Sequence, residues 1–231
     1  MTNYVPIIID LLLVVLAGFF LYNGAKNGFA RSVIYFAGYL GSLLVCVVAS
    51  RFLATALFDA LLRDRMVEQL NTAIGSQTTL EGVLTGVQQA LAQLPGILSN
   101  ALNAANIPIQ DSVQQYWDAG AVDLAGSLVD RTVGPVIIGL LQSILFVVLF
   151  FICLFLVKHL ANCFRFVNKI PLIGFVNKLF GGVIGLLTAG VFFVVVAMVL
   201  QLLISITGDG IPYLTTENIN ATYLFKWFYQ L

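Results

Sequence analysis

Three polar side chains, Asp10, Gln142 and Gln201, lie within long apolar stretches of this 231-residue sequence. Each is about five or six residues from one end of its stretch, so at a rise of 1.5 Å per residue they share a depth of roughly 8 Å. A carboxyl group between two amides could relay protons or bind a polar solute, which is a common role of acids inside membranes. The alternative is structural: the three groups satisfy one another as a clamp, or Asp10 reaches water at the nearby helix end.

The stretches that must position these side chains are long enough to cross a bilayer. Apolar residues make up 60% of the chain, against about 45–50% in soluble domains. Four segments, at about 5–22, 32–50, 136–157 and 183–206, approach or exceed the ~20 apolar residues that a membrane span requires. The sequence therefore predicts an all-α integral membrane protein with four transmembrane helices.

The charged residues indicate how these helices are oriented. Six basic residues and no acid occupy the connections after the first and third spans: Lys26, Arg31, Lys158, Arg165, Lys169 and Lys178. Ten acids and five basic residues occupy the other side. Because short basic loops stay in the cytoplasm during insertion, we expect two out-in-out hairpins with both termini outside the cytoplasm.

This orientation divides the chain into four parts. They are a first transmembrane hairpin (1–50), an extracytoplasmic amphipathic helical insert (51–134), a second transmembrane hairpin (135–207) and an extracytoplasmic aromatic tail (208–231). Within the insert, Thr78 and Glu81 match a capping box, and Pro95 should kink or split the helix that follows. The aromatic residues of the tail favour a membrane interface.

Small residues at helix-packing spacing recur in the fourth span, at Gly181, Gly185 and Ala189. In lipid, such residues allow close approach of helix backbones. Packing within one chain and a homo-oligomer seam both remain open.

The sequence contains no arrangement typical of an enzyme. The single histidine, His159, has no Ser, Asp or metal-ligand pattern around it, and the glycine-rich run 180–190 lacks the residues of a phosphate-binding loop. We therefore expect no catalytic activity, metal or cofactor. Cys46, Cys153 and Cys163 have no metal-like spacing, and we expect free, buried thiols.

Two stretches resemble the bacterial colicin V production protein family. The first is Asp10 followed by the elbow "NGAKNGFARS" (23–32), with Gly24, Lys26 and Gly28. The second is "NKIPLIGFVNKLFGGVIGLLTAG" (168–190), with the motif positions Pro171, Asn177, Lys178, Gly182 and Gly185. The resemblance implies a four-span protein of the bacterial cytoplasmic membrane, linked to toxin production and envelope homeostasis. Asn177 is expected to cap the fourth span.

Two functions are compatible with these features. One is a small transport or channel-like component whose outer-leaflet polar site is Asp10, Gln142 and Gln201. The other is a non-transporting scaffold that recruits an export or envelope protein through the insert. In both cases the expected surroundings are membrane lipid, with no nucleic-acid partner.

Overall fold

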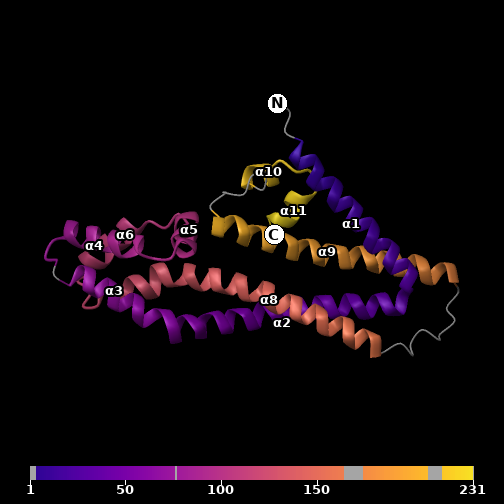
Figure 1. The fold of residues 1–231 in the computed structure, drawn as a ribbon, viewed down its shortest axis with the longest axis horizontal. Coiled ribbons are helices and arrows are strands. Elements are labelled where there is room, and N and C mark those ends of the chain that lie inside the picture. The colour runs from indigo at the N-terminus through magenta and orange to yellow at the C-terminus, as the bar shows by residue number, and fades with distance from the viewer. Residues whose placement is uncertain (1–3, 76, 164–173, 208–214, 231) are drawn as a thin grey trace. The chain divides into compact units, whose positions relative to one another are not determined.

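In the computed structural model, which describes residues 4–75, 77–163, 174–207 and 215–230, the secondary structure is helical and contains no strand (Figure 1). Four helical stretches are long and apolar enough to cross a membrane: Val5–Asn27, Phe29–Ile74, Leu124–His159 and Gly174–Ile204. This confirms four spanning segments, by length and composition. The chain is therefore a multi-pass membrane protein.

The first two spans are separated by a single residue. Helix α1 (Val5–Asn27) ends just before Gly28, and α2 (Phe29–Leu57) begins directly after it. Gly28 has a φ of +78°, a backbone region that costs an L side chain energy but not glycine. The elbow predicted as a short loop is thus almost wholly helical, and Gly28 alone reverses the chain.

Two of the spanning helices continue well beyond a bilayer's thickness. Helix α2 is extended by the π-helical segment η1 (Phe58–Arg63) and by α3 (Asp64–Ile74). Likewise α7 (Leu124–Leu128) and the π-helical η2 (Val129–Val133) lead into α8 (Gly134–Cys163). A 46-residue helix is about 69 Å long, so only part of it fits a ~30 Å apolar layer.

The chain divides into two compact units. Unit 1 comprises Met1–Val48, Phe146–Ile204 and Asp209–Leu231, and unit 2 comprises Ala49–Leu145 with Ser205–Gly208.

Helix α9 (Gly174–Thr207) contributes to both apolar cores of unit 1. One core joins α9 to α1 and to two short tail helices, α10 (Thr216–Asn220) and α11 (Phe225–Tyr229). The other joins α9 to α2 and α8, and in it the Cys46 and Cys153 sulfur atoms lie 3.6 Å apart as free thiols. Unit 1 therefore contains parts of all four spanning helices, together with the tail helices.

Unit 2 has a separate core, built from η1, η2, the start of α8 and the helices between them. These include α4 (Leu80–Ala92), α5 (Gly96–Ala104) and α6 (Ile109–Asp118). The predicted break at Pro95 is confirmed, since it separates α4 from α5. The predicted cap was one residue off: Thr79, not Thr78, accepts the Gly82 amide at 3.2 Å, because Leu80 is the first helical residue.

An ion pair links the two π-helical segments of unit 2. The Arg63 guanidinium donates to both carboxylate oxygens of Asp130, each at 2.8 Å. This two-point geometry orients the side chains more strictly than a single contact does.

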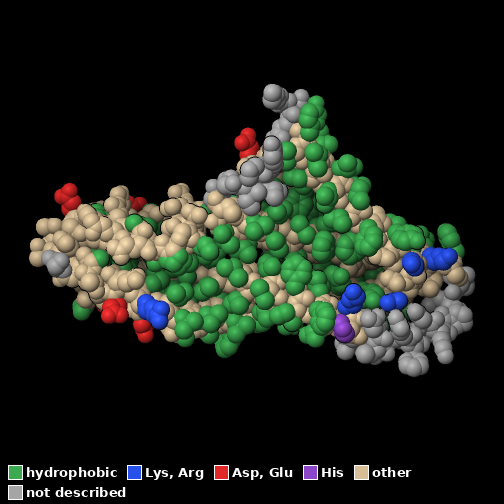
Figure 2. Space-filling model, viewed as in Figure 1, with side chains coloured by type: hydrophobic (Ala, Val, Ile, Leu, Met, Phe, Trp, Pro, Cys, Tyr) green, Lys and Arg blue, Asp and Glu red, His purple; other side chains and the backbone are tan. Residues whose placement is uncertain are grey.

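The spans present apolar faces to their surroundings, which Figure 2 shows as hydrophobic side chains covering α1. Eight such residues on α1 are each more than half exposed: Ile7, Ile8, Leu11, Leu12, Val14, Val15, Phe19 and Tyr22. Contiguous apolar surface of this kind is typical of contact with lipid.

Candidate functional site

Asp10, the acid of the first span, is buried and binds the C-terminal tail. Its Oδ2 accepts the Tyr223 amide at 2.6 Å, and its Oδ1 accepts the amides of Leu224 and Phe225 at 3.1 and 3.0 Å. These three N–H groups lie at the start of α11, where a helix has free donors and a partial positive charge. The carboxylate therefore has the partners that make an acid tolerable inside a membrane protein.

Two further side chains complete the binding of α11. The Thr222 hydroxyl accepts the Lys226 amide at 2.9 Å, so a fourth N–H of the tail is satisfied. At the other end, Gln201 Nε2 donates to the Tyr229 carbonyl at 2.6 Å. Asp10 and Gln201 thus bind opposite ends of one short helix, with charges and dipoles matched to each end.

Apolar contacts hold the same helix against α1 and α9. Phe225 is 3% exposed within the core that also contains Leu13 and Phe193. The Phe228 ring packs edge-on against Phe193, with ring centroids 5.4 Å apart. The tail is thus an integral part of unit 1. Trp227 remains 68% exposed, and the interfacial position of the tail stays a prediction.

We expected Asp10, Gln142 and Gln201 to form one polar group, but in the structure Asp10 and Gln201 have separate partners. Asp10 and Gln201 are linked through α11 and not through each other. Gln142 is half-buried on α8, in the part that belongs to unit 2. Asp10 is thus held by backbone amides of the tail and not by the two glutamines.

The family-motif glycines form a crossing of α1 and α9. A methyl group on Gly24 would overlap the Gly181 carbonyl oxygen, and one on Gly185 would overlap that of Phe20. Gly182 also faces α1, but at ordinary contact distance. Backbones that touch in this way maximise dispersion contact, which drives helix association in lipid.

The small-residue stripe Gly181, Gly185 and Ala189 is thus occupied by packing within the chain. The two glycines contact α1, and Ala189 is 1% exposed in the core shared with it. This accounts for the stripe without a second copy.

Asn177 joins the two motifs of the sequence. Its Oδ1 accepts the Phe29 amide at 2.7 Å, so it caps α2 from α9 and does not cap its own helix as we expected. Its amide also lies against Gly28, where a methyl group would be 2.7 Å from Nδ2. Asn177 therefore holds the elbow against the start of the fourth span.

Replacing Asn177 tests this cap. Asn177→Ala should lower the free energy of unfolding by about 1 kcal/mol, the usual cost of losing a side-chain cap. Asn177→Asp keeps the acceptor oxygen and should stay near the wild-type value. Thermal unfolding of the purified protein in nanodiscs measures both, and equal losses in the two variants would contradict the assignment.

The remaining motif residues are not brought together. Lys26 and Lys178 are exposed on α1 and α9. Pro171, with Arg165 and Lys169 of the same connection, lies outside the described residues.

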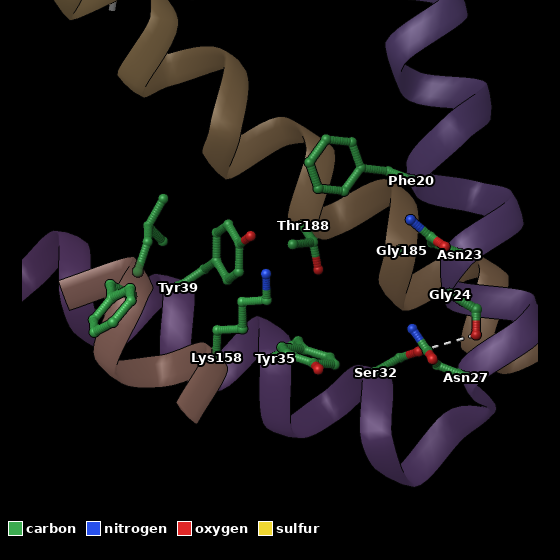
Figure 3. Close-up of a pocket in the computed structure, with 12 residues that line it drawn as sticks. Phe20, Asn23, Gly24, Asn27, Ser32, Tyr35, Tyr39, Lys158, Gly185 and Thr188 are labelled. Carbon is green, nitrogen blue, oxygen red and sulfur yellow. Dashed lines mark hydrogen bonds between the residues drawn. The ribbon is translucent and has the colours of Figure 1, made fainter. Parts of the chain in front are cut away.

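A cavity near the elbow was not anticipated from the sequence (Figure 3). It has a volume of about 450 Å³, and residues of all four spans line it, including Tyr39, Lys158 and Thr188. From the sequence, membrane orientation is the favoured role of Lys158, and attraction of anionic lipid headgroups by its connection is the alternative. No local sequence signal brings Lys158 beside Tyr39, because their helices meet only in the folded bundle.

The chain was compared with known protein families, curated proteins and solved structures. Residues 121–229 match the family model described as "Colicin V production protein". No curated protein and no solved structure matches the chain. The matched range contains Asn177, Gly185, Gln201 and the tail as far as Tyr229, whereas Asp10 and the elbow precede it. Over residues 121–229, the chain is therefore similar to the colicin V production protein family.

Proposed function

We propose that this protein is a non-enzymatic scaffold of the bacterial cytoplasmic membrane that serves toxin production or envelope homeostasis. Four spans anchor it, and the helical lobe at 51–134 recruits a protein partner outside the cytoplasm. The observation that carries the proposal is the separate core of unit 2. A segment with its own packed core can offer a stable surface, which a flexible connection cannot.

The charge of the lobe suggests the character of its partner. Residues 51–134 contain eight acids and four arginines, and Arg63 is already paired with Asp130. Glu81, Asp111 and Asp118 are exposed on α4 and α6. Complementary charge steers association, so the expected partner carries a basic surface.

The test combines orientation and capture in intact cells. In a cysteine-free background, Gln114→Cys on the lobe should react with an impermeant maleimide, while Lys178→Cys should be protected until the membrane is opened. A photo-crosslinking residue at exposed Gln88 or Gln89 of α4 should then yield an adduct with one protein.

If the partner binds through its basic surface, the yield of this adduct should depend on the acidic side chains of the lobe. The combined change Glu81→Gln, Asp111→Asn and Asp118→Asn should reduce its yield at least about tenfold, whereas Glu217→Gln on α10 should not. A protected lobe, adducts with lipid alone, or a yield indifferent to the triple change would each contradict the scaffold.

The transport alternative places its site at Asp10, Gln142 and Gln201. Against it stands the occupied carboxylate of Asp10, which accepts three backbone amides. Proteoliposomes decide between the two: proton flux above that of protein-free vesicles, lost in a folded Asp10→Asn variant, would favour transport.

A further inference from the structure

The described residues that line the cavity of unit 1 supply hydrogen-bond donors and apolar rings, and none of them is an acid. Its polar lining comprises Asn23, Asn27, Ser32, Tyr35, Tyr39, Lys158 and Thr188. Phe20, Leu154 and Phe155 supply apolar wall. Figure 3 shows the Lys158 ammonium directed into the space between Tyr35, Tyr39 and Thr188.

Several of these donors are not used within the protein. Among the described residues, no carboxylate or carbonyl pairs with the Lys158 ammonium, and the Tyr39 hydroxyl has no hydrogen-bond partner. Tyr35 accepts a hydrogen bond from Arg31 at 3.1 Å, which leaves its own O–H free to donate. Free donors around a cation, without a competing acid, fit a bound anion.

Other polar groups of the lining are already engaged. Ser32 donates to the Gly24 carbonyl at 3.0 Å, and Thr188 donates to that of Ile184 at 2.8 Å. Arg31 adds positive charge nearby, since its guanidinium carbon lies 5.5 Å from the centre of the Tyr35 ring. The anion would therefore be centred on Lys158, Tyr35 and Tyr39.

We propose that this cavity binds a phosphate-bearing anion through Lys158, Tyr35 and Tyr39, and that the anion is the headgroup of an acidic phospholipid. The apolar rings beside the donors match the glycerol and acyl chains that follow such a headgroup. Basic pockets between spans are known to hold acidic headgroups on the cytoplasmic side, and the volume lies within the range of ligand pockets. This inference is independent of the proposed scaffold role.

Native mass spectrometry of the purified full-length protein tests the site. Phosphatidylglycerol, with a net charge of −1, should remain bound where the neutral phosphatidylcholine is lost. Lys158→Gln should weaken phosphatidylglycerol binding about tenfold, the usual scale for one charge-assisted hydrogen bond. Tyr39→Phe should weaken it about threefold.

The matched control is Lys178→Gln, which removes the same charge from an exposed position of α9 that does not line the cavity. It should stay within about twofold of the wild type. Equal losses at Lys158 and Lys178, or equal binding of the two lipids, would overturn the site. Unchanged melting of Lys158→Gln excludes unfolding as the cause of its loss.

A separate arm distinguishes the lipid from a soluble anion. Inorganic phosphate is added to protein held in phosphatidylcholine nanodiscs, and its effect on melting is compared in wild type and Lys158→Gln. No stabilisation supports the lipid. Stabilisation that depends on Lys158 would overturn the lipid assignment and identify a soluble phosphate as the ligand.

Discussion

Asp10→Ala should release the C-terminal tail and lower the free energy of unfolding by at least about 3 kcal/mol. The substitution removes the acceptor of three amides at once, and a hydrogen bond to a charged group contributes about 1.5–3 kcal/mol. The freed N–H groups stay next to an apolar core, where unsatisfied donors are costly. Hydrogen exchange over 215–230, together with thermal unfolding, measures the effect.

Two variants calibrate this result. Asp10→Asn keeps one acceptor oxygen and should lose about half as much. Gln201→Ala removes a single hydrogen bond at an exposed side chain and should cost about 1 kcal/mol. Normal protection of the tail in Asp10→Ala would show that the carboxylate does not hold α11.

Gly185→Ala should separate α1 from α9 and destabilise the protein by about 1–3 kcal/mol, the usual cost of overpacking. The added methyl group meets the Phe20 carbonyl oxygen and lies 3.2 Å from the Gly24 Cα. Both are backbone atoms of α1, which cannot rotate away as a side chain can. Thermal unfolding in nanodiscs gives the size of the loss.

Gly190→Ala is the matched control in the same helix. Nothing lies within 4 Å of the methyl group that it adds, and alanine is favoured over glycine in a helix interior by about 0.5–1 kcal/mol. The two substitutions should therefore change stability in opposite directions. A loss of similar size at Gly190 would mean that close backbone contact at the crossing does not control the effect.

These predictions bear on function because they separate residues that stabilise the fold from residues that bind a partner. If the tail and the crossing are structural, variants at Asp10 and Gly185 change stability first, and any loss of capture by the lobe follows from unfolding. Surface changes at Glu81, Asp111 and Asp118 should instead reduce capture without changing stability, since these side chains are exposed.

The amino-acid sequence by itself determined the membrane class, the four spans and the break at Pro95. Each of these depends on local quantities, namely the length of an apolar run and the missing N–H of proline. The sequence also identified Asp10, Gly185 and Asn177 as positions of interest, because an intramembrane acid, a small residue and a helix-capping side chain are unusual where they occur.

Only the tertiary structure decided what these residues contact. Asp10 binds amides more than two hundred positions away, Asn177 caps a helix begun 148 positions earlier, and Lys158 faces tyrosines of another span. Every residue except proline carries the same backbone N–H group, so the sequence does not show which amides a side chain will bind. The surfaces of the spans are also similarly apolar, so no local pattern specifies which spans pack together. They follow from how the helices pack, where close backbone contact and satisfied hydrogen bonds select one arrangement.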